Sequence, residues 1–407
     1  MNGTRTYLDY NASAPLRPEA RAAVVAALDV AGNPSSVHAE GRAARALVET
    51  AREEIARLIG AKPSEIVFTS GATEASNWVL HRSWRTIYTA DIEHAAVRAP
   101  CLASEGRLVR LPVRADGVID AAAFASAVAE CPHADRAGHS LLVVQAANNE
   151  TGVLQPVAEM AATARAHGLA VFSDAVQAVG RIALDVSALG VDYLSLSAHK
   201  IGGPKGIGAL VLRDGAQTVA PLPPFVIGGG QERRRRGGTE NVAAIAGFGA
   251  AASAAARDLA DMVRLARLRD RLEREALRIA PDAVVIGAGA SRLPNTASFA
   301  LRGVSADRLV IALDLDGIAI SAGSACASGK VGASHVLAAM GLAPELSSSA
   351  IRISLGHATT DADIDAFLAA FARHAARQAA TTQNETKLTA DAAPQARARS
   401  TTSAGER

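Results

Sequence analysis

The sequence predicts an α/β protein whose larger, N-terminal part contains a mostly parallel sheet. Short apolar runs alternate with helical segments between residues 66 and 212, and this alternation is typical of a parallel sheet with helices on both faces. An amphipathic segment over about 259–279 then leads to further strands and helices, which indicates a second, smaller α/β or α+β domain. The chain has 407 residues, 49% of them hydrophobic, and this is enough for two such cores.

The elements of the larger part follow a regular order. Residues 1–17 hold a short apolar piece broken by Pro15 and predict an arm that joins a core. Pro18 is well placed to begin a helix through Leu28, and apolar residues at helical spacing predict a second helix that ends near Ile59. Strands are expected at 66–69, 87–89, 108–113, 141–144, 170–172, 191–198 and 207–212, with helices near 72–84, from 95, from 120 and over 156–168.

The smaller part has its own elements. Strands are expected near 284 and over 296–301, 318–321 and 351–355, with helices over 306–313, 334–340 and 361–376. We therefore predict a large domain of residues 13–258 and a small domain of residues 1–12 and 259–377. The stretch 378–407 lacks apolar periodicity and is predicted to be disordered.

Composition argues against several classes of function. The formal net charge is +2 and 233–236 is the one dense basic run, so no nucleic-acid partner is expected. We see no apolar stretch of the about 20 residues that span a bilayer and no signal-peptide pattern, and we expect a cytoplasmic protein without membrane contact. The three cysteines, Cys101, Cys131 and Cys326, are widely spaced, which predicts neither a disulfide framework nor a metal site.

The strand that ends near Lys200 carries the central hypothesis. Residues 191–198 alternate as a strand would, Lys200 follows directly, and a glycine-rich turn comes next. Open α/β sheets bind ligands at the carboxyl ends of strands, so we hypothesise that Lys200 holds a cofactor as a Schiff base. Taken alone, the segment fits better with a lysine that reaches out to water. The other strand ends decide between the two interpretations.

Polar residues also follow the other strands of the expected sheet. Each has a plainer interpretation by itself: Thr73 as a helix cap, His94 as a structural histidine, Asn149 as part of a turn. Because the carboxyl ends of parallel strands meet at one edge, we expect these residues to lie together. The set fits pyridoxal 5'-phosphate (PLP), which requires a lysine for its aldehyde and a carboxylate facing its pyridine nitrogen.

The residue types suggest which part of PLP each would hold. Asp174 ends an apolar strand and is the natural partner of the pyridine nitrogen, while the flat ring of His94 can stack on the cofactor. Gln177 and Asn149 can hydrogen-bond the phenolic oxygen or a substrate carboxylate. The phosphate is expected near a helix N-terminus and hydroxyl or imidazole groups, namely Thr73, Ser197 and His199.

Ten segments in this order resemble the cysteine desulfurases of the NifS/IscS type within the class V aminotransferase family. The resemblance covers Tyr7 to Ala376 and rests on the following segments: YLDYNASAP, GNPSSVHAEGR, EIVFTSGATEASN, EHAAV, NNETGVLQP, DAVQAVGRIALDV, VDYLSLSAHKIGGPKGIGALV, GGGQERRRRGGTENV, SAGSACASG and SSAIRISLG. It implies a fold-type-I PLP-dependent transferase with a mostly parallel, seven-stranded sheet in the large domain.

The resemblance also implies a role for each site residue. Lys200 resembles the Schiff-base lysine, Asp174 the pyridine-nitrogen partner and His94 the stacking, proton-transferring histidine. Gln177 resembles the partner of the phenolic oxygen. Ala72, Thr73, Ser197 and His199 match phosphate and cofactor positions, whereas Asn149 and Arg352 match the groups that hold the substrate carboxylate. Thr239 matches a threonine that reaches the phosphate of the other subunit, which implies a homodimer.

Cys326 identifies the reaction within the family. A cysteine in a small, glycine-containing loop is usually incidental, but this one matches the catalytic cysteine of the desulfurases. The implied activity converts L-cysteine to L-alanine and leaves a persulfide on Cys326. The alternatives are a selenocysteine lyase, another PLP-dependent lyase or aminotransferase, and a non-catalytic sulfur-binding scaffold. Cys101 and Cys131 have no comparable setting.

The sulfur acceptor is not identified by the sequence. Iron-sulfur cluster assembly, tRNA thiolation and other carriers are all compatible with the resemblance. The stretch after Ala376 lacks the apolar and aromatic residues with which housekeeping members engage a cluster scaffold. Ala198 stands where the family often has glycine, and Ser13 where threonine is common; both departures are mild.

Overall fold

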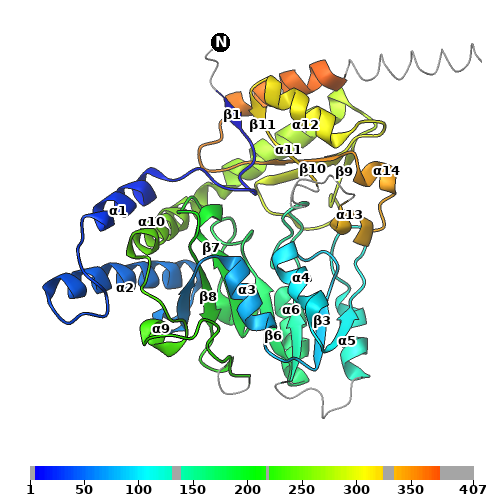
Figure 1. Ribbon diagram of the computed structural model, residues 1–407. Helices are drawn as coiled ribbons and strands as arrows, with labels where there is room; N and C mark the ends of the chain where they lie inside the picture. Colours follow the sequence, from blue (N-terminus) through cyan, green and yellow to red (C-terminus); the bar gives the residue numbers. More distant parts are fainter. Residues whose placement is uncertain (1–4, 131–138, 217–219, 324–333, 376–407) are drawn as a thin grey trace, which may run out of the picture.

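A computed structural model describes residues 5–130, 139–216, 220–323 and 334–375 of the chain. Figure 1 shows a larger part built around one sheet and a smaller part above it, with the N-terminal arm entering the smaller part first. The helical stretch α10–α11 runs from the one part into the other.

The larger part is organised by a seven-stranded sheet with the order β2-β8-β7-β6-β5-β3-β4. All neighbouring strands are parallel except that β8 is antiparallel to both β2 and β7. The predicted mostly parallel sheet is therefore confirmed. The strands are β2 (Ile66–Thr69), β3 (Thr86–Thr89), β4 (Arg107–Arg110), β5 (Ser140–Val143), β6 (Ala170–Asp174), β7 (Tyr193–Ser197) and β8 (Gly208–Leu212).

Helices cover both faces of this sheet because its strands are apolar on both sides. In β5, Leu141 and Val143 pack into one apolar cluster with α3 and α4, whereas Leu142 packs into another with α2, α5, α6 and α10. The helices are α1 (Pro18–Leu28), α2 (Ala39–Ile59), α3 (Ala72–Leu80), α4 (Ala95–Ala103), α5 (Ala121–Ala129), α6 (Val157–Ala166), α7 (Val186–Leu189), α9 (Gln231–Arg234) and α10 (Val242–Asp258), with single 3-10 turns at Pro63–Glu65, Ala198–Lys200 and Leu259–Asp261.

The edge strand β4 is shorter than the 108–113 that the sequence predicts. It ends at Arg110, and Pro112, which has no backbone N–H, follows two residues later. A proline cannot donate to the strand ladder, so the pairing with β3 stops before it.

Helix α10 continues almost without interruption into α11 (Met262–Ile279) through one 3-10 turn. By length and composition alone, the combined stretch Val242–Ile279 would suffice to cross a membrane, and it is the one such stretch among the described residues. The sequence alone predicts no stretch of this kind. Half of its most apolar window is buried inside the protein, where α10 packs against α1 and α2.

The smaller part contains a four-stranded sheet of order β12-β13-β10-β9 in which all pairs are antiparallel. Its arrangement is thus α+β, the second of the two predicted alternatives. A short parallel pair joins the arm strand β1 (Thr6–Tyr7) to β11. The other elements are β9 (Val284–Val285), β10 (Thr296–Ala300), α12 (Ala306–Leu315), β11 (Ile318–Ala319), β12 (Ser321–Ala322), α13 (His335–Ala339), α14 (Pro344–Ser347), β13 (Ala350–Ser354) and a helix over 361–375.

Helix α13 packs on the larger part although it lies late in the chain. Its Val336 and Leu337, and Met340 just after it, are buried in the same apolar cluster as the large sheet, whereas α11, α12 and β13 contribute to a separate cluster. The division into domains of residues 13–258 and of 1–12 with 259–377 stays a prediction. The stretch 378–407, predicted to be disordered, lies outside the described residues.

Candidate active site

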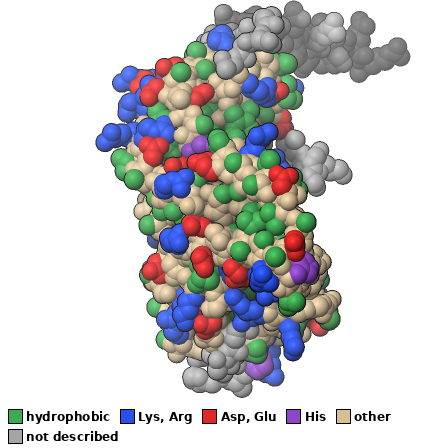
Figure 2. Space-filling view, turned by 90° about the vertical axis from the view of Figure 1, so that its left-hand side faces the viewer, with side chains coloured by type: hydrophobic (Ala, Val, Ile, Leu, Met, Phe, Trp, Pro, Cys, Tyr) green, Lys and Arg blue, Asp and Glu red, His purple; other side chains and the backbone are tan. Residues whose placement is uncertain are grey.

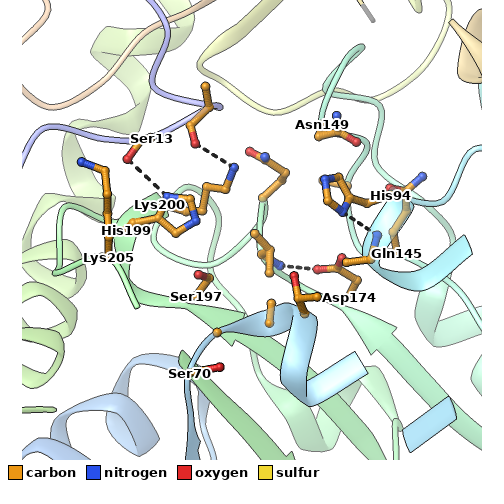
Figure 3. A pocket seen from close by; sticks show the side chains of 18 of the residues that line it. Ser13, Ser70, His94, Gln145, Asn149, Asp174, Ser197, His199, Lys200 and Lys205 are labelled. Carbon is orange, nitrogen blue, oxygen red and sulfur yellow. Dashed lines mark hydrogen bonds between the residues drawn. The ribbon is translucent and has the colours of Figure 1, made fainter. Parts of the chain in front are cut away.

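A cavity of about 490 Å³ opens at the carboxyl ends of the parallel strands (Figure 3). Residues that are far apart in the sequence meet there, as the parallel topology predicts. The cavity is lined by the following predicted site residues: Ala72, Thr73, His94, Asn149, Asp174, Gln177, Ser197, His199 and Lys200. Thr239 and Arg352 do not line it, and Cys326 lies outside the described residues.

Lys200 enters this cavity from the 3-10 turn that follows β7. Its ammonium group donates hydrogen bonds to the backbone carbonyls of Asn11 and Ala12, at 2.6 and 3.1 Å from Nζ. Gly202, directly beyond, has a φ of +84°, and a Cβ there would lie 2.6 Å from Cγ of Arg17. The tight turn thus sets the amine against the N-terminal arm at the cavity.

Asp174 is the last residue of β6 and is almost fully buried. Its Oδ1 accepts a hydrogen bond from the backbone N–H of Val176 at 2.9 Å. Burial raises the pKa of Asp174, and the positive fields of His94 and Lys200 partly counteract this. A protonated ring nitrogen facing this carboxylate would supply the positive charge that a buried anion needs, so the residue fits its predicted role.

His94 caps the N-terminus of α4. Its Nδ1 accepts a hydrogen bond from the backbone N–H of Ala96 at 3.1 Å, so the proton of the neutral ring is on Nε2. Burial lowers the pKa of His94; Asp174 opposes this shift, and Lys200 and His335 add to it. The ring is therefore neutral near pH 7, with a defined donor nitrogen beside the cavity.

The start of α3 offers a site for a phosphate. Its N-cap, Gly71, has no side chain to satisfy the first N–H groups of the helix, and Gly71, Ala72 and Thr73 line the cavity together with Ser197. Gly208 on β8 permits this approach, because a Cβ there would lie 2.7 Å from Cα of Gly71. The N–H groups at the start of the helix and the Ser197 hydroxyl together can form an anion site.

His199 lies beside this end of the cavity. Its Nδ1 is 3.2 Å from the hydroxyl oxygen of Ser13 on the arm. Burial, together with the positive charges of Lys200, Lys205 and Arg181, lowers the pKa of His199 to about 4. The imidazole is thus neutral in the folded protein and can serve as a hydrogen-bonding group.

This shift predicts a pH dependence of stability. An unfolded His199 takes up a proton near its usual pKa of 6.5, whereas the folded protein resists protonation down to about 4. The contribution of His199 to the free energy of unfolding is therefore complete above pH 6.5, and it is lost as the pH falls from 6.5 to about 4. We expect His199→Asn to lose less unfolding free energy than wild type between about pH 7.5 and about pH 4.5, measured by urea denaturation. Parallel pH curves for the two proteins would contradict this expectation.

Gln177 and Asn149 line the cavity and are fixed by neighbours. Nε2 of Gln177 donates to the carbonyl of Asn11 at 3.1 Å, and Arg181 donates to its Oε1. The backbone carbonyl of Asn149 accepts from Arg352 at 3.0 Å, which leaves the Asn149 side chain pointing into the cavity region (Figure 3). The Gln177 amide is therefore held in place, whereas at Asn149 it is the backbone that is held beside the cavity.

Arg352 lies behind Asn149, on β13 of the smaller sheet. It is 2% exposed, and one of its terminal nitrogens pairs with Asp9 at 2.8 Å. Its Nε is buried and has no hydrogen-bond partner among the described residues. Two of its five N–H groups thus bind Asp9 and the Asn149 carbonyl, and its predicted contact with a substrate carboxylate stays a prediction.

Thr239 lines a smaller, adjoining cavity of about 270 Å³. This second cavity shares Ser70 and Gly206 with the first one and so borders the phosphate end. Arg236, at its edge, pairs with Glu74 of α3 at 3.0 Å. The contact of Thr239 with the other subunit stays a prediction.

Several residues of the site were not foreseen from the sequence. Asn11 receives hydrogen bonds from both Lys200 and Gln177 at its carbonyl, while Gln145 and Lys205 line the cavity. Gln145 follows β5 and its position after a strand was a usable signal. A backbone carbonyl such as that of Asn11 has no sequence signature.

The remaining cysteine in the described residues is inert. Cys101 is buried in α4, and burial raises the pKa of its thiol to about 12. A thiol that stays protonated is a poor nucleophile. This agrees with its interpretation as structural or incidental.

One cavity at the edge of a mostly parallel sheet brings together a lysine, a buried aspartate, a capping histidine and an anion site. This combination is that of a PLP-dependent enzyme of fold type I. The class-V aminotransferase family matches residues 6–367. The chain is 40% identical over 371 residues to cysteine desulfurase IscS of Dictyoglomus turgidum, covering 88% of this chain and 91% of that protein. It therefore belongs to the cysteine desulfurases of the class-V aminotransferase family.

Further relatives agree with this assignment. The IscS-like cysteine desulfurase of Mycobacterium tuberculosis is 42% identical over 380 residues, covering 89% of this chain and 94% of its own length. Among solved structures, a NifS-like protein from Rickettsia africae superimposes with a TM-score of 0.82 at 34% identity and covers 90% of this chain and 98% of that one. The fold is thus shared over almost the whole described chain.

Proposed function

We propose that the protein removes sulfur from L-cysteine, releasing L-alanine and leaving a persulfide on Cys326. The observation that carries this proposal is the convergence of Lys200, Asp174 and His94 on one cavity in a chain whose relatives are cysteine desulfurases. A solved relative at 30% identity, SspA, is described in complex with cysteine.

Different residues of the cavity are assigned to cofactor binding, to substrate binding and to proton transfer. PLP, when bound, supplies an electron sink for the substrate α-carbon. Lys200 holds the cofactor and carries a proton at Nζ, and Asp174 stabilises positive charge at the ring nitrogen. His94 would lie against the cofactor and carry a proton at Nε2, while the N–H groups at the start of α3 would hold the phosphate. Asn149 and Arg352 are the groups we assign to the substrate carboxylate.

Cys326 accepts the sulfur in this scheme. Its thiolate forms a bond to the substrate sulfur as the bond between that sulfur and Cβ breaks, and the electron pair left on carbon takes up a proton. The sulfur atoms are oxidised to the persulfide level and the carbon is reduced to the methyl group of alanine. Atoms and electrons therefore balance without an external oxidant.

Replacing Cys326 tests this assignment. We expect Cys326→Ala to release no more than about 1% of the wild-type sulfide and alanine from L-cysteine, because the nucleophile is absent. Alanine and sulfide are measured in the presence of a thiol reductant, with Cys101→Ala as the matched control that keeps wild-type turnover. Full sulfur release by Cys326→Ala would exclude the persulfide mechanism.

We further propose that the active assembly is a homodimer. Support comes from the position of Thr239 beside the phosphate end of the cavity and from exposed apolar side chains on the same side of the molecule. Figure 2 views the side that carries α1, α2 and α9 and shows hydrophobic side chains among the charged ones. Those with large exposed fractions include Val25, Leu28, Val37 and Ile227.

A sulfur-acceptor protein is the remaining partner that we propose. Iron-sulfur cluster assembly is the first candidate pathway, because the relatives include proteins named IscS. Thiolation of tRNA is the second. The cytoplasmic location expected from the sequence stays a prediction.

A further inference from the structure

Helix α13 makes two polar contacts with turns that follow strands of the large sheet. Ser334, its N-cap, donates from its hydroxyl to Oε2 of Glu150 at 2.5 Å. His335, its first residue, lies with Nε2 3.0 Å from the backbone carbonyl of Glu93. Glu150 and Glu93 each directly adjoin a residue of the cavity, namely Asn149 and His94.

The contact of Ser334 fixes the turn that carries Asn149. The Ser334 oxygen also accepts the N–H of Leu337 at 3.1 Å, so its own proton is directed to Glu150. Glu150 is 3% exposed, and the backbone N–H of Glu150 is bound by Oδ1 of Asn148 at 2.9 Å. Burial raises the pKa of Glu150 to about 7, and the Ser334 hydrogen bond acts against this shift. Within the described part of the chain, the Ser334 hydroxyl thus donates to this buried carboxyl group, which also lies in the positive field of Arg352.

The contact of His335 fixes the backbone just before His94. A carbonyl oxygen only accepts, so Nε2 of His335 is the donor. On the other side of the same segment, Oε1 of Glu93 accepts the backbone N–H of Gln145 at 2.9 Å. The peptide that joins Glu93 to His94 is therefore held from α13 and from the turn after β5.

Apolar packing seats the helix independently of these polar groups. Val336 and Leu337 are each 1% exposed and lie in the apolar cluster of the large sheet. Removal of one polar contact should therefore leave α13 in place, and any local effect can be separated from loss of the fold.

We propose that Ser334, His335 and Glu150 are positioning residues, through which the first turn of α13 holds Asn149 and His94 at the cavity. This inference rests on the proposed desulfurase function, because it concerns two residues assigned to that reaction. The two contacts act on different residues: Ser334 through Glu150 on Asn149, and His335 through the Glu93 carbonyl on His94. They should therefore have different kinetic consequences.

The experiment compares the holoenzymes of Ser334→Ala and His335→Leu with their conservative counterparts Ser334→Thr and His335→Gln. Thr keeps the hydroxyl and Gln keeps an N–H donor. Ser348→Ala, which removes an exposed hydroxyl bound only to the carbonyl of Glu345 on neighbouring α14, is the matched control. Amide hydrogen exchange and steady-state kinetics with L-cysteine are measured for each variant.

In Ser334→Ala we expect faster exchange confined to about residues 148–152 and a KM for cysteine about tenfold higher, because Asn149 is assigned to substrate binding. In His335→Leu we expect faster exchange over about 93–97 and a kcat about tenfold lower with KM nearly unchanged, because His94 carries protons in the reaction. The conservative variants and Ser348→Ala should resemble wild type.

Unchanged exchange at both turns, or an equal increase across β6 and β7, would overturn the positioning role. The exchange data do not require turnover, so they test the positioning role of Ser334 and His335 even if the enzyme is inactive on cysteine. A wild-type enzyme that releases no alanine would instead refute the proposed function.

Discussion

Lys200→Ala is expected to abolish turnover of L-cysteine completely. In the proposed mechanism the amine supplies both the covalent attachment of the cofactor and a proton carrier, and it is held by the carbonyls of Asn11 and Ala12 at the cavity. Loss of such a residue commonly costs three or more powers of ten in kcat, of the order of 4 kcal/mol in the barrier. The variant should also lack the visible absorbance that the attached cofactor gives the wild-type enzyme.

Lys205→Ala is the matched control for this experiment. Lys205 lines the same cavity but has no role in the proposed mechanism, so its loss should preserve the visible absorbance at saturating cofactor. Alanine formation and absorbance are measured for both variants. A Lys200→Ala enzyme that turned over cysteine would show that another group performs its role.

Arg52→Met is expected to lower the free energy of unfolding by about 3–5 kcal/mol, because it leaves a buried carboxylate without its partner. The Arg52 guanidinium binds both carboxylate oxygens of Glu232, at 2.8 and 2.9 Å, and both side chains are almost fully buried. Glu232 also accepts the backbone N–H of Phe68 in β2 at 2.9 Å. The pair therefore ties the segment that leads to Thr239 to the strand before the phosphate site.

Backbone strain at and after Glu232 increases the need for the Arg52–Glu232 ion pair, because the strained conformation depends on contacts that hold it. Glu232, Arg233 and Arg234 have φ values of 45°, 55° and 64°, a region in which side chains other than glycine are disfavoured. Such conformations persist where surrounding contacts hold them, and the Arg52 pair and the Phe68 N–H are buried contacts that hold Glu232. The segment should therefore relax when Arg52 is removed.

Urea denaturation of Arg52→Met, Arg52→Met/Glu232→Gln and Arg57→Met tests this expectation. The double variant should be less destabilised than the single one, because no uncompensated charge remains buried. Arg57 pairs with Glu54 on the exposed face of the same helix, and its replacement should change stability little. Equal losses in Arg52→Met and Arg57→Met would show that burial of the pair is unimportant.

Local sequence patterns were sufficient to predict most of the large sheet. Both ends of strand β2 were predicted correctly, because four consecutive β-forming residues stand between turns. The predicted range of β4, in contrast, extends past Pro112, beyond the observed end of the strand. The cavity could also be predicted, because parallel strands bring Thr73, His94, Asp174 and Lys200 to one edge. These inferences depend only on periodicity and topology.

The contacts that complete the site could not be predicted in this way. The Asn11 carbonyl, the Ser334–Glu150 pair and the Asp9–Arg352 pair all join residues that are remote in sequence and belong to elements with no shared pattern. The resemblance implies a role for Arg352 at the substrate, and no local pattern predicts that the same side chain binds Asp9 and the Asn149 carbonyl. Tertiary packing determines such pairings, and local patterns in a single sequence do not predict them.

The arm before α1 makes the catalytic centre inseparable from the smaller part of the protein. Its β1 pairs with β11, its Asn11 side chain binds Thr296 of β10, and its carbonyl at Asn11 receives Lys200. A fragment that begins at Pro18 would retain the whole large sheet and yet lack the acceptors that orient the lysine. The large part is therefore not an autonomous module that could be exchanged between proteins, and the smallest unit able to perform the chemistry spans both parts of the fold.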